Sequence, residues 1–567
     1  MTESPPNIVA AALSGFRAYR ERFAALTARA EARFRAADWR GLQADSTERL
    51  DVYEQCLEAV VSDLTRDHPG LSHAHDLWRH AKTAFERQAV RTSDPDLAET
   101  FFNSVSRRIL QTAGVDPAVE FVRFQAPPLA PPRQPQDYRV YPLAETPAEV
   151  VFRQVLQDSR LAPILVDPAH DALRIHRALK RQKIECPPDA RLEVLTTIFY
   201  RGMGAYLIGR LLLADGTTHP LAVAFVHRAG RVAADGVITD ERGIRILFSY
   251  THSYFLAATE NIGGLIGFLQ MLMPQRRRAE LFISLGYNRH GKTELYRDLT
   301  QHQNACRDIF VISPGKRGMV MAVFNMPSDD LVFKVIRDRF AKPKRTTRRE
   351  VIAKYDYIFR HDRTGRLPDT QNFEHLKFER GCFHPELANE LLQSAADSVV
   401  ADGDELILSF VYVERRVTPL DVYLRSASAE QARAAVIDFG QAIKDMAASN
   451  IFPGDMLIKN FGVTELGRVI FYDFDEVCPL TACRFRRQPR AASYEDELAA
   501  QPWYLVEEND IFPEEFVSFL GLKAELRNVF MTHHADIFTP EFWQAHQDRI
   551  QSNNLVHVYP YRRFNAE

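Results

Sequence analysis

Apolar residues recur every three or four positions over residues 8–120, while Arg and Glu fill many of the positions between them. Tyr53, Cys56, Leu57 and Val60 show this spacing, which places their side chains on one face of a helix. The pattern predicts a run of amphipathic α-helices that share a buried face.

A proline-rich stretch follows at residues 126–142 and predicts an extended linker or an ordered arm. Helical spacing returns at residues 145–185. Between residues 191 and 255, the apolar runs AYLIGRLLL, LAVAFVH and IRILFSYTH alternate with turn signals such as Asp215-Gly216. These runs predict a small antiparallel sheet, and a further helix is expected near residues 263–272.

The second half of the chain is rich in strand patterns and then in helical ones. FVISPGKRGMVMAVFNM and DDLVFKVIRDRF predict the two strands of a hairpin, LILSFVYV predicts another strand, and residues 428–449 predict a helix. We therefore expect an α+β protein of two domains. Residues 1–305 would form a mostly α-helical domain with a small antiparallel sheet, and residues 306–567 would form the second domain.

Composition narrows the class of protein. A chain of 567 residues is too long for one hydrophobic core. A net charge of −3 does not indicate binding to nucleic acid or to an anionic membrane. The apolar stretch at residues 262–273 is about half of the roughly 20 residues that span a bilayer. Six scattered cysteines without a CxxC pair, and no secretory signal, predict reduced thiols and a cytoplasmic protein.

Phosphoryl transfer requires a loop over the phosphates, a lysine that grips them, oxygen ligands for Mg²⁺ and a base for the attacking hydroxyl. The segment SPGKRGMV fits the kinase loop G-x-G-x-x-G-x-V with serine in place of the first glycine. Ordinary hairpin turns share this spacing, so the loop alone decides nothing. The expected ATP-binding loop consists of Ser313, Pro314, Gly315, Lys316, Arg317, Gly318 and Met319.

Lys334 lies on the next predicted strand, fourteen residues after the final valine of that loop. A hairpin of this length brings the lysine beneath the loop, where it would grip ATP. Glu350 is the candidate acidic partner of Lys334. The adenine would lie at a hinge near Tyr412, Val413 and Glu414.

Three polar residues carry the strongest signal. Asp455 precedes Asn460 by five residues, and Asp473 follows Asn460 by thirteen, which are the intervals of the catalytic loop and magnesium aspartate of protein kinases. Asp455 would accept or orient the hydroxyl proton, while Asn460 and Asp473 would hold Mg²⁺. Asp475 adds a carboxylate where kinases have glycine, and it could serve water-directed chemistry.

Two other motifs compete with this interpretation. Asp438-Phe439-Gly440 spells DFG but precedes the catalytic loop within a helical pattern, so we expect it to be part of a helix. Residues 286–293, GYNRHGKT, fit the P-loop consensus after the strand-like LFISL. They would form a P-loop ATPase site, a secondary phosphate contact or a structural turn.

Longer motifs resemble the bacterial isocitrate dehydrogenase kinase/phosphatase family. The similarity includes SPGKRGMVM, VFKVIRDRFA, DTQNFE, SNIFPGDMLIKNFGV and FYDFDE, and continues through EDELAAQPWY, DIFPEEF and VYPYRR. The resemblance implies a bifunctional enzyme that phosphorylates and dephosphorylates a serine of NADP-dependent isocitrate dehydrogenase, controlling flux between the citric acid cycle and the glyoxylate bypass. It also implies a helical regulatory domain, a bilobal protein-kinase-like domain, MgATP, ADP or ATP in the phosphatase direction, AMP as effector, and a homodimer.

The resemblance also assigns residues. Asp369, in LPDTQNF, matches an aspartate that serves chiefly the phosphatase reaction, beside the catalytic candidates Asp455 and Asp475. The AMP effector would contact Lys292, Thr293 and Tyr296. Arg484, Arg486 and Arg487, in the long segment at 476–513, would recognise the protein substrate.

Pro453-Gly454 replaces the His-Arg pair that precedes the catalytic aspartate of ordinary kinases. That arginine normally binds an activation-loop phosphate, so its replacement predicts no activation by loop phosphorylation. Two alternatives of other classes stay open: a pseudokinase-type, nucleotide-gated binding protein, and a P-loop ATPase.

Overall fold

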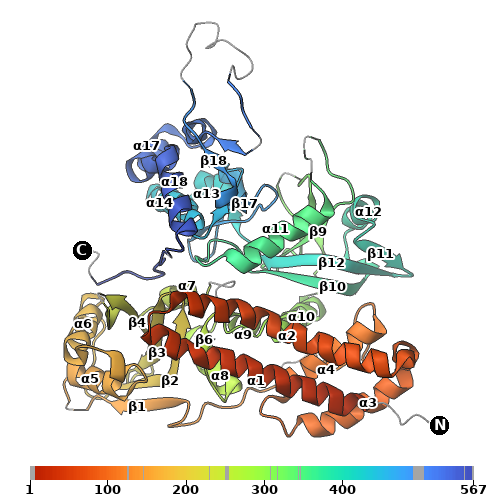
Figure 1. The fold of residues 1–567 in the computed structure, drawn as a ribbon, viewed down its shortest axis with the longest axis horizontal. Helices are drawn as coiled ribbons and strands as arrows, with labels where there is room; N and C mark the ends of the chain where they lie inside the picture. The colour runs from red at the N-terminus through yellow and green to blue at the C-terminus, as the bar shows by residue number, and fades with distance from the viewer. Residues whose placement is uncertain are drawn as a thin grey trace.

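A computed structural model describes residues 7–123, 127–144, 146–228, 230–249, 254–306, 308–315, 317–342, 344, 346–489, 504–507, 509–554 and 556–564. It is an α+β structure, as the patterns predict. The N-terminal half forms an elongated body in Figure 1, and the C-terminal half lies along one side of it.

Four helices open the chain and confirm the helical prediction for residues 8–110, whereas residues 111–120 are not helical. The long helices α1 and α2 run side by side along the N-terminal half (Figure 1). Asn7 and Asp38 cap them by accepting hydrogen bonds from Ala10 N and Gly41 N. The bounds are α1 Ile8–Arg35, α2 Trp39–Asp67, α3 His75–Ala89 and α4 Pro95–Leu110.

An antiparallel sheet of order β1-β2-β3-β4-β5, with β6 beside β2, follows the proline-rich stretch. Leu192 and Val194 pack toward α5 and α6. Leu195 and Phe199 instead pack into the core that α1–α4 share with the helices at Glu241–Phe248, Ile262–Leu272 and Arg278–Ser284. Both faces are buried, which explains the nearly continuous apolar runs. The bounds are β1 Tyr138–Pro142, β2 Arg191–Arg201, β3 Gly204–Leu212, β4 Thr218–Arg228, β5 Arg231–Ile238, β6 Leu256–Ala257, α5 Ala148–Asp158 and α6 Pro168–Arg181.

Two strand predictions are wrong. IRILFSYTH contributes to the helix α7 (Glu241–Phe248), which Asp240 caps through Gly243 N, and LFISL lies in the helix α9 (Arg278–Ser284). Short apolar runs that are buried have no polar face, so periodicity does not separate strand from helix. The adjoining helices α8 (Ile262–Leu272) and α10 (Asn288–Cys306) complete this half.

The C-terminal half begins with a second antiparallel sheet, of order β10-β12-β9-β8-β7, with β11 beside β12. The predicted hairpin is confirmed as β8 and β9, where Val323 lies opposite Lys334. The bounds are β7 Val311–Ile312, β8 Met321–Asn325, β9 Leu331–Ile336, β10 Thr370–Glu379, β11 Val399–Asp402, β12 Glu405–Arg415, α11 Arg348–His361 and α12 Pro385–Ser394.

A mostly helical part follows, and its core is continuous with residues of α11 and the second sheet. Its short strands include the hairpin β15–β16, and β18 and β19 pair in parallel. The bounds are α13 Leu420–Ser426, α14 Ala429–Ala448, α16 Phe516–Phe519, α17 Ala524–His534, α18 Pro540–Gln551, β13 Thr418–Pro419, β14 Ile451–Phe452, β15 Phe461–Val463, β16 Val469–Phe471, β17 Cys478–Pro479, β18 Arg484–Phe485 and β19 Asp510–Ile511.

The end of the chain returns to the N-terminal half (Figure 1). Phe564 N donates to the carbonyl oxygen of Asp235 on β5, and Arg563 Nε lies 2.8 Å from the Asp235 carboxylate. Arg415 on β12 also reaches Glu280 on α9, at 2.6 Å. These contacts tie the two halves together beyond the chain connection near residue 306.

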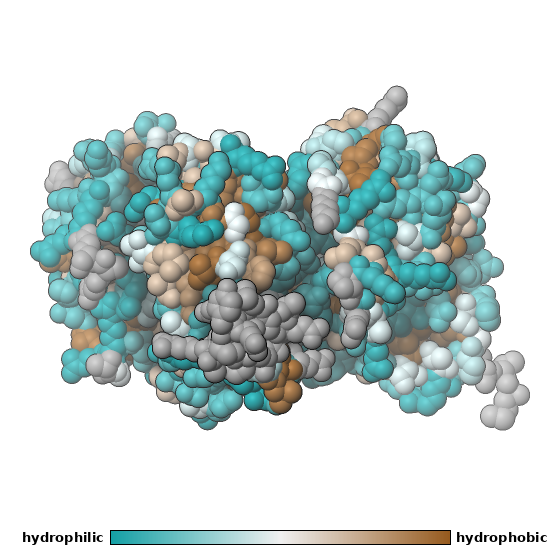
Figure 2. Space-filling model, turned by 90° about the horizontal axis from the view of Figure 1, so that it is seen from above, coloured by the Kyte–Doolittle hydropathy of each residue, from teal (hydrophilic) through white to brown (hydrophobic). Residues whose placement is uncertain are grey.

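Hydrophilic residues cover most of the face shown in Figure 2, and hydrophobic residues gather there in separate patches. Within the described ranges, no helix combines the length and apolar character that a bilayer crossing requires.

The DFG sequence lies inside α14, as predicted. Asp438 accepts two hydrogen bonds from Arg366, at 2.8 and 2.9 Å, and Asp445 accepts a third at 2.7 Å. Arg366 also donates to the carbonyl oxygen of Val469 on β16. This buried guanidinium therefore joins α14 to the hairpin that carries the candidate metal ligands.

Replacing Arg366 with Met should lower the free energy of unfolding by about 3–5 kcal/mol, because two carboxylates would lose their buried partner. Arg433→Met, on an exposed face of the same helix, should change it by less than about 0.5 kcal/mol. Urea denaturation measures the free energy of unfolding of both variants. A loss below 1 kcal/mol for Arg366→Met would show that the network is not structural.

Candidate functional site

Lys334 is buried on β9 and its charge is paired. Its Nζ lies 2.6 Å from Glu414 Oε1 and donates to the carbonyl oxygen of Tyr472 at 3.0 Å. Glu414 lies on the neighbouring strand β12, two residues beyond the residue opposite Lys334, so both side chains are on one face of the sheet. Thr370 Oγ1 donates to the second carboxylate oxygen of Glu414 at 2.9 Å.

Glu350 is not the partner of Lys334, so that prediction is wrong. Its side chain accepts from Thr347 N at 2.7 Å and forms the capping box of α11, where it is exposed. The capping role follows from local sequence, because Thr347 and Glu350 have the spacing T-x-x-E.

The expected phosphate loop connects β7 and β8. Ser313 N donates to the Val323 carbonyl oxygen at 3.0 Å, and Gly315 has a φ of 123°, which favours glycine. Arg317 points to α12, where it pairs with Glu386 at 2.5 Å. Lys316 lies outside the described residues.

The three residues expected at the adenine hinge are buried and contact other parts of the protein. Tyr412 stacks on Tyr355 of α11 with ring centroids 4.0 Å apart, Val413 is buried in the sheet, and Glu414 binds Lys334. The chain leaves β12 at Arg415, immediately beyond them.

A hairpin brings Asn460 and Asp473 to the same place. β15 and β16 pair so that Phe461 lies opposite Phe471, and Tyr472 N donates to the Asn460 carbonyl oxygen at 3.0 Å. Asp473 follows directly. Asp455 is tied to the same turn, because Asn460 Nδ2 donates to its carbonyl oxygen at 3.3 Å.

The oxygen atoms of this turn fit a hard divalent cation. Among the described residues, neither the Asp473 carboxylate nor Asn460 Oδ1 accepts a hydrogen bond, although Asn460 is only 4% exposed. Unengaged carboxylate and amide oxygens are the ligand types that Mg²⁺ prefers. Lys334, bound to the neighbouring Tyr472 carbonyl oxygen, would place a cationic donor beside the same ion.

Asp475 adds a second carboxylate close to Asp473. Burial, followed by the charge of Asp473, raises the pKa of Asp475 to about 6. Lys344 Nζ lies 3.9 Å from its carboxylate, and Lys354 donates to its carbonyl oxygen. Two lysines therefore compensate part of the negative charge here.

Asp369 lies at the start of β10, on the side that faces the N-terminal half. Its Oδ1 accepts from Gln371 Nε2 at 2.6 Å, and its charge acts on Tyr254, Arg276 and Lys292. The adjacent Thr370 reaches Glu414, so Asp369 is one residue from the contacts around Lys334.

Lys292 lines a cavity of about 270 Å³ between the halves. Its Nζ donates to Asn372 Oδ1 on β10 at 2.5 Å. Residues of α2 and α11, together with Tyr412 and Phe474, line other sides of the cavity. Thr293 and Tyr296 lie on the same helix but do not line it; Thr293 accepts a hydrogen bond from Thr100 of α4.

The P-loop match lacks its structural context. A P-loop follows a strand, whereas residues 286–293 follow α9 and begin α10. Gly286 has a φ of 88° and forms the tight turn between the two helices. The observed geometry matches the structural-turn alternative.

The three arginines expected to bind the protein substrate are tied to nearby carboxylates. Arg486 pairs with Asp510, and Arg487 lies 2.7 Å from Glu541. Arg484 pairs with Glu507 and lies 3.4 Å from Asp510. Residues 490–503 and 508 of this segment are outside the described ranges.

Comparisons with known proteins identify the family. The regulatory-domain model of isocitrate dehydrogenase kinase/phosphatase (AceK) matches residues 9–307, and the kinase-domain model matches residues 308–563. The chain belongs to the isocitrate dehydrogenase kinase/phosphatase family. The resemblance seen in the motifs is thereby confirmed, and the family is one of enzymes with kinase and phosphatase activity.

Relatives with that name match nearly the whole chain. One from Anaeromyxobacter sp. (strain Fw109-5) is 43% identical over 98% of both chains. One from Anaeromyxobacter dehalogenans (strain 2CP-C) is 42% identical over 97% of this chain and 95% of its own. Another, from Albidiferax ferrireducens, is 37% identical over 99% of this chain and 96% of its own.

Sequence reasoning missed the Lys334–Glu414 pair and the contribution of the regulatory half to the Lys292 cavity. Glu414 could have been found by aligning β9 and β12 as neighbouring strands, because acidic and basic residues then share one face. The cavity contributions of Arg49, Tyr53 and Arg360 have no local sequence signal, since they come from distant helices.

Replacing Lys292 with Met tests the environment of this lysine. Burial lowers the pKa of Lys292 to about 7, so below pH 7 the folded protein holds a charged amine at a cost. Lys292→Met should therefore raise the free energy of unfolding by about 1–2 kcal/mol at pH 6.

The stability gain of Lys292→Met over the wild type should shrink between pH 7 and pH 10. In this range the folded wild type has lost the Lys292 proton while the unfolded chain keeps it, so the free energy of unfolding of the wild type rises with pH. Urea denaturation across this range measures the difference, with the exposed Lys523→Met as control. A difference that does not vary with pH would contradict the lowered pKa.

Proposed function

We propose that this chain transfers the γ-phosphoryl group of ATP to a serine of NADP-dependent isocitrate dehydrogenase and removes it again, controlling flux between the citric acid cycle and the glyoxylate bypass. The observation that supports it best is the convergence of Lys334, Asn460 and Asp473 through the Tyr472 carbonyl and amide groups. The names of the family and its relatives supply the protein substrate.

In this proposal residues 306–567 form a bilobal, protein-kinase-like catalytic domain, and residues 1–305 regulate it. The sheet β7–β12 with α11 and α12 would be one lobe, and the helical part from α13 onward the other. ATP would lie between the loop at 313–319 and the β15–β16 hairpin, with the adenine against the chain beyond β12. Residues 561–564 contact Asp235 of β5, so the end of the chain would also connect the catalytic domain to the regulatory one.

The residues of the candidate site would have different roles in the kinase reaction. Asn460 and Asp473 would hold Mg²⁺, which neutralises charge on the phosphates. Lys334, paired with and oriented by Glu414, would bind a phosphate oxygen. Asp455 would accept the serine proton, because it sits five residues before the metal-binding asparagine in the same turn.

The phosphatase reaction would use the same turn. Asp475, whose pKa of about 6 lets it gain or lose a proton near neutrality, is suited to move a proton to or from water. Asp369 would assist from the start of β10, near Thr370 and Glu414.

The cavity at Lys292 is the place we propose for AMP. It adjoins both halves and includes Tyr412, two residues before Glu414, and Phe474, directly after Asp473. A nucleotide there would contact both the regulatory helices and residues beside the catalytic cleft. Thr293 and Tyr296 would contribute through α10. The homodimer and the cytoplasmic location remain part of the proposal.

Asn460→Ala and Asp473→Ala should each reduce both phosphorylation of isocitrate dehydrogenase and release of the phosphate by about 100-fold or more, because one metal site serves both. Transfer from labelled ATP and release of label measure the two reactions. Asp397→Ala, an exposed aspartate, is the matched control. Full phosphatase activity in either variant would refute the shared site.

The Lys334→Met variant separates this proposal from the two alternatives. It should lose kinase activity by about 100-fold, while Lys523→Met retains it. A P-loop ATPase predicts the reverse pattern, with ATP hydrolysis lost in Lys292→Ala and kept in Lys334→Met. A binding protein without catalysis predicts inhibition of isocitrate dehydrogenase that needs no label transfer and survives Asp455→Ala.

A further inference from the structure

Two cysteine side chains that the proposed reaction does not use lie in contact. The sulfur atoms of Cys478, on β17, and Cys483 are 3.6 Å apart. Both are free thiols, and Cys478 is partly exposed whereas Cys483 is buried. A disulfide holds its two sulfur atoms about 2.05 Å apart, so a bond between these thiols requires them to approach by about 1.5 Å.

The backbone between the two cysteines is held in place by several contacts. β17, which carries Cys478, pairs with β14. Leu480 N donates to the carbonyl oxygen of Asn450 at 3.0 Å. Gln547 Nε2, on α18, donates to the carbonyl oxygens of Leu480 and Cys483, both at 2.8 Å. This backbone keeps the two thiols close together, which favours a reaction between them over a reaction of either with a second molecule of the protein.

The surroundings of Cys478 favour its thiolate. The Cys483 thiol, which donates to the Cys478 sulfur, and the charge of Lys354 lower the pKa of Cys478. Because the thiolate is the form that attacks a disulfide, Cys478 is the nucleophile of the pair. The hydrogen bond with Cys478, followed by burial, raises the pKa of Cys483, so this residue stays a thiol until Cys478 has reacted.

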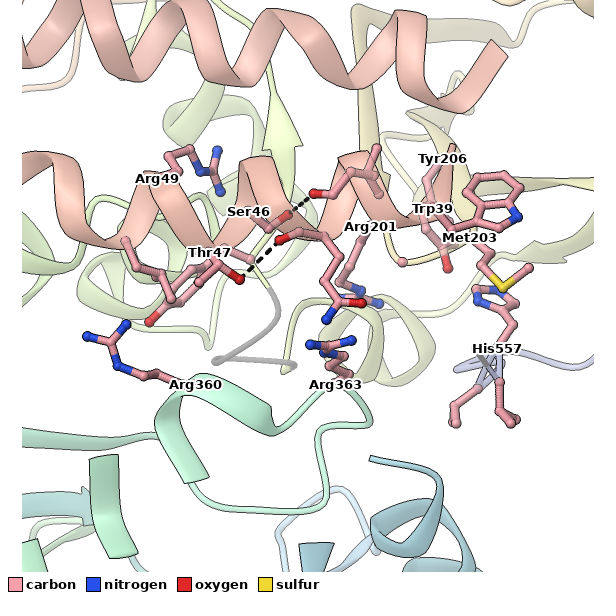
Figure 3. Close-up of a pocket in the computed structure, with 17 residues that line it drawn as sticks. Trp39, Ser46, Thr47, Arg49, Arg201, Met203, Tyr206, Arg360, Arg363 and His557 are labelled. Carbon is pink, nitrogen blue, oxygen red and sulfur yellow. Dashed lines mark hydrogen bonds between the residues drawn. The ribbon is translucent and has the colours of Figure 1, made fainter. Parts of the chain in front are cut away.

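The helix α11, which carries Lys354, also contacts the regulatory half. Near the end of this helix Arg360 pairs with Asp51 of α2 at 3.1 Å. Beside that pair lies an arginine-lined cavity of about 100 Å³ (Figure 3). Its lining includes Arg49, Arg201, Arg360 and Arg363. α11 therefore connects the surroundings of Cys478 with the contact between the halves.

The thiol pair lies next to the turn of the candidate base. β14, the partner of the strand that carries Cys478, leads directly into Pro453-Gly454-Asp455. The Glu476 carbonyl oxygen lies 2.4 Å from the position that a Cβ would take on Gly454, so the two backbones are in close contact there. Closely packed groups transmit a displacement to their neighbours. A shift of Cys478 toward Cys483 therefore acts on the turn that holds Asp455.

We propose that Cys478 and Cys483 form a reversible disulfide on reaction with a low-molecular-weight disulfide, and that this bond slows the phosphoryl transfer proposed above. The bond itself follows from the contact between the two sulfur atoms, whereas its effect on the rate rests on the proposed function.

The reaction takes two steps. The Cys478 thiolate attacks one sulfur of the small disulfide, whose S–S bond breaks, and the first small thiol leaves with the proton that Cys478 has lost. The Cys483 sulfur then gives up its proton and attacks Cys478 Sγ, which breaks the mixed disulfide and releases the second small thiol. Two protein thiols are oxidised to one disulfide, and the small disulfide is reduced to two thiols.

Peptide mass measurement after incubation of the full chain with glutathione disulfide tests the bond. The remaining thiols are alkylated, and the protein is digested with trypsin without reductant. Trypsin releases residues 469–484 as one peptide that contains both cysteines, because it cleaves after Arg468 and Arg484. This peptide should be lighter by two hydrogen atoms, carry no alkyl group and regain both thiols with dithiothreitol. Two alkylated thiols, or glutathione attached without the internal bond, would overturn the proposal.

Three variants assign the roles of the two thiols. Cys483→Ser should keep glutathione attached to Cys478, because no second thiol can displace it. Cys478→Ser should leave the buried Cys483 unmodified. Cys306→Ser, at an exposed cysteine of α10, is the matched control and should form the internal bond as the wild type does. Attachment of glutathione to Cys483 in Cys478→Ser at the wild-type rate would contradict the assigned nucleophile.

Transfer of label from ATP to isocitrate dehydrogenase, after removal of glutathione, measures the effect on the rate. The oxidised wild type should transfer label about threefold or more slowly than the reduced protein, because small displacements of catalytic groups cost much rate. Cys478→Ser, treated in the same way, should keep its untreated rate. Equal rates for the oxidised and the reduced wild type would overturn the proposed effect. Absence of transfer by the reduced protein would count against the proposed function instead, and the peptide mass would still decide the disulfide.

Discussion

The buried ion pair between Lys334 and Glu414 is the constraint on which the candidate site around Tyr472 depends. Both residues lie on paired strands of one sheet, so the backbone ladder fixes the lysine within a rigid element. In ordinary protein kinases the corresponding lysine pairs with a glutamate on a mobile helix, and movement of that helix controls activity. Here the helix α11 uses Glu350 only to cap itself.

This arrangement changes where regulation can act. Pro453-Gly454 supplies no arginine to read an activation-loop phosphate, and the Lys334 pair does not need α11 to move. The contacts between the halves are another place where a ligand could act. Two cavities lie there, and Arg360 at the end of α11 lines both of them. A ligand that changes how α11 packs on α2 would act on Tyr355 and Tyr412, and through them on the strand that carries Glu414.

Much of the fold could be predicted from local patterns, because amphipathic helices and alternating strands record which face is buried. The helices of residues 8–120, the β8–β9 hairpin and α14 follow this rule. The runs that form α7 and α9 could not be predicted in this way, because they are largely buried and carry no clear periodic signal. Within the candidate site, the proximity of Asp455, Asn460 and Asp473 could be predicted because their spacing reflects one turn and one hairpin. Glu414 and the arginine-lined cavity depend on strand register and domain packing, which spacing does not encode.

A crystal structure of the protein with Mg²⁺ and a non-hydrolysable ATP analogue tests the central claim most directly. The account predicts a metal ion bound by Asn460 Oδ1 and the Asp473 carboxylate, with a phosphate oxygen at Lys334 Nζ and the Lys334–Glu414 pair retained. Triphosphate bound instead at the turn of residues 286–293, with the Asn460–Asp473 hairpin free of metal, would contradict it.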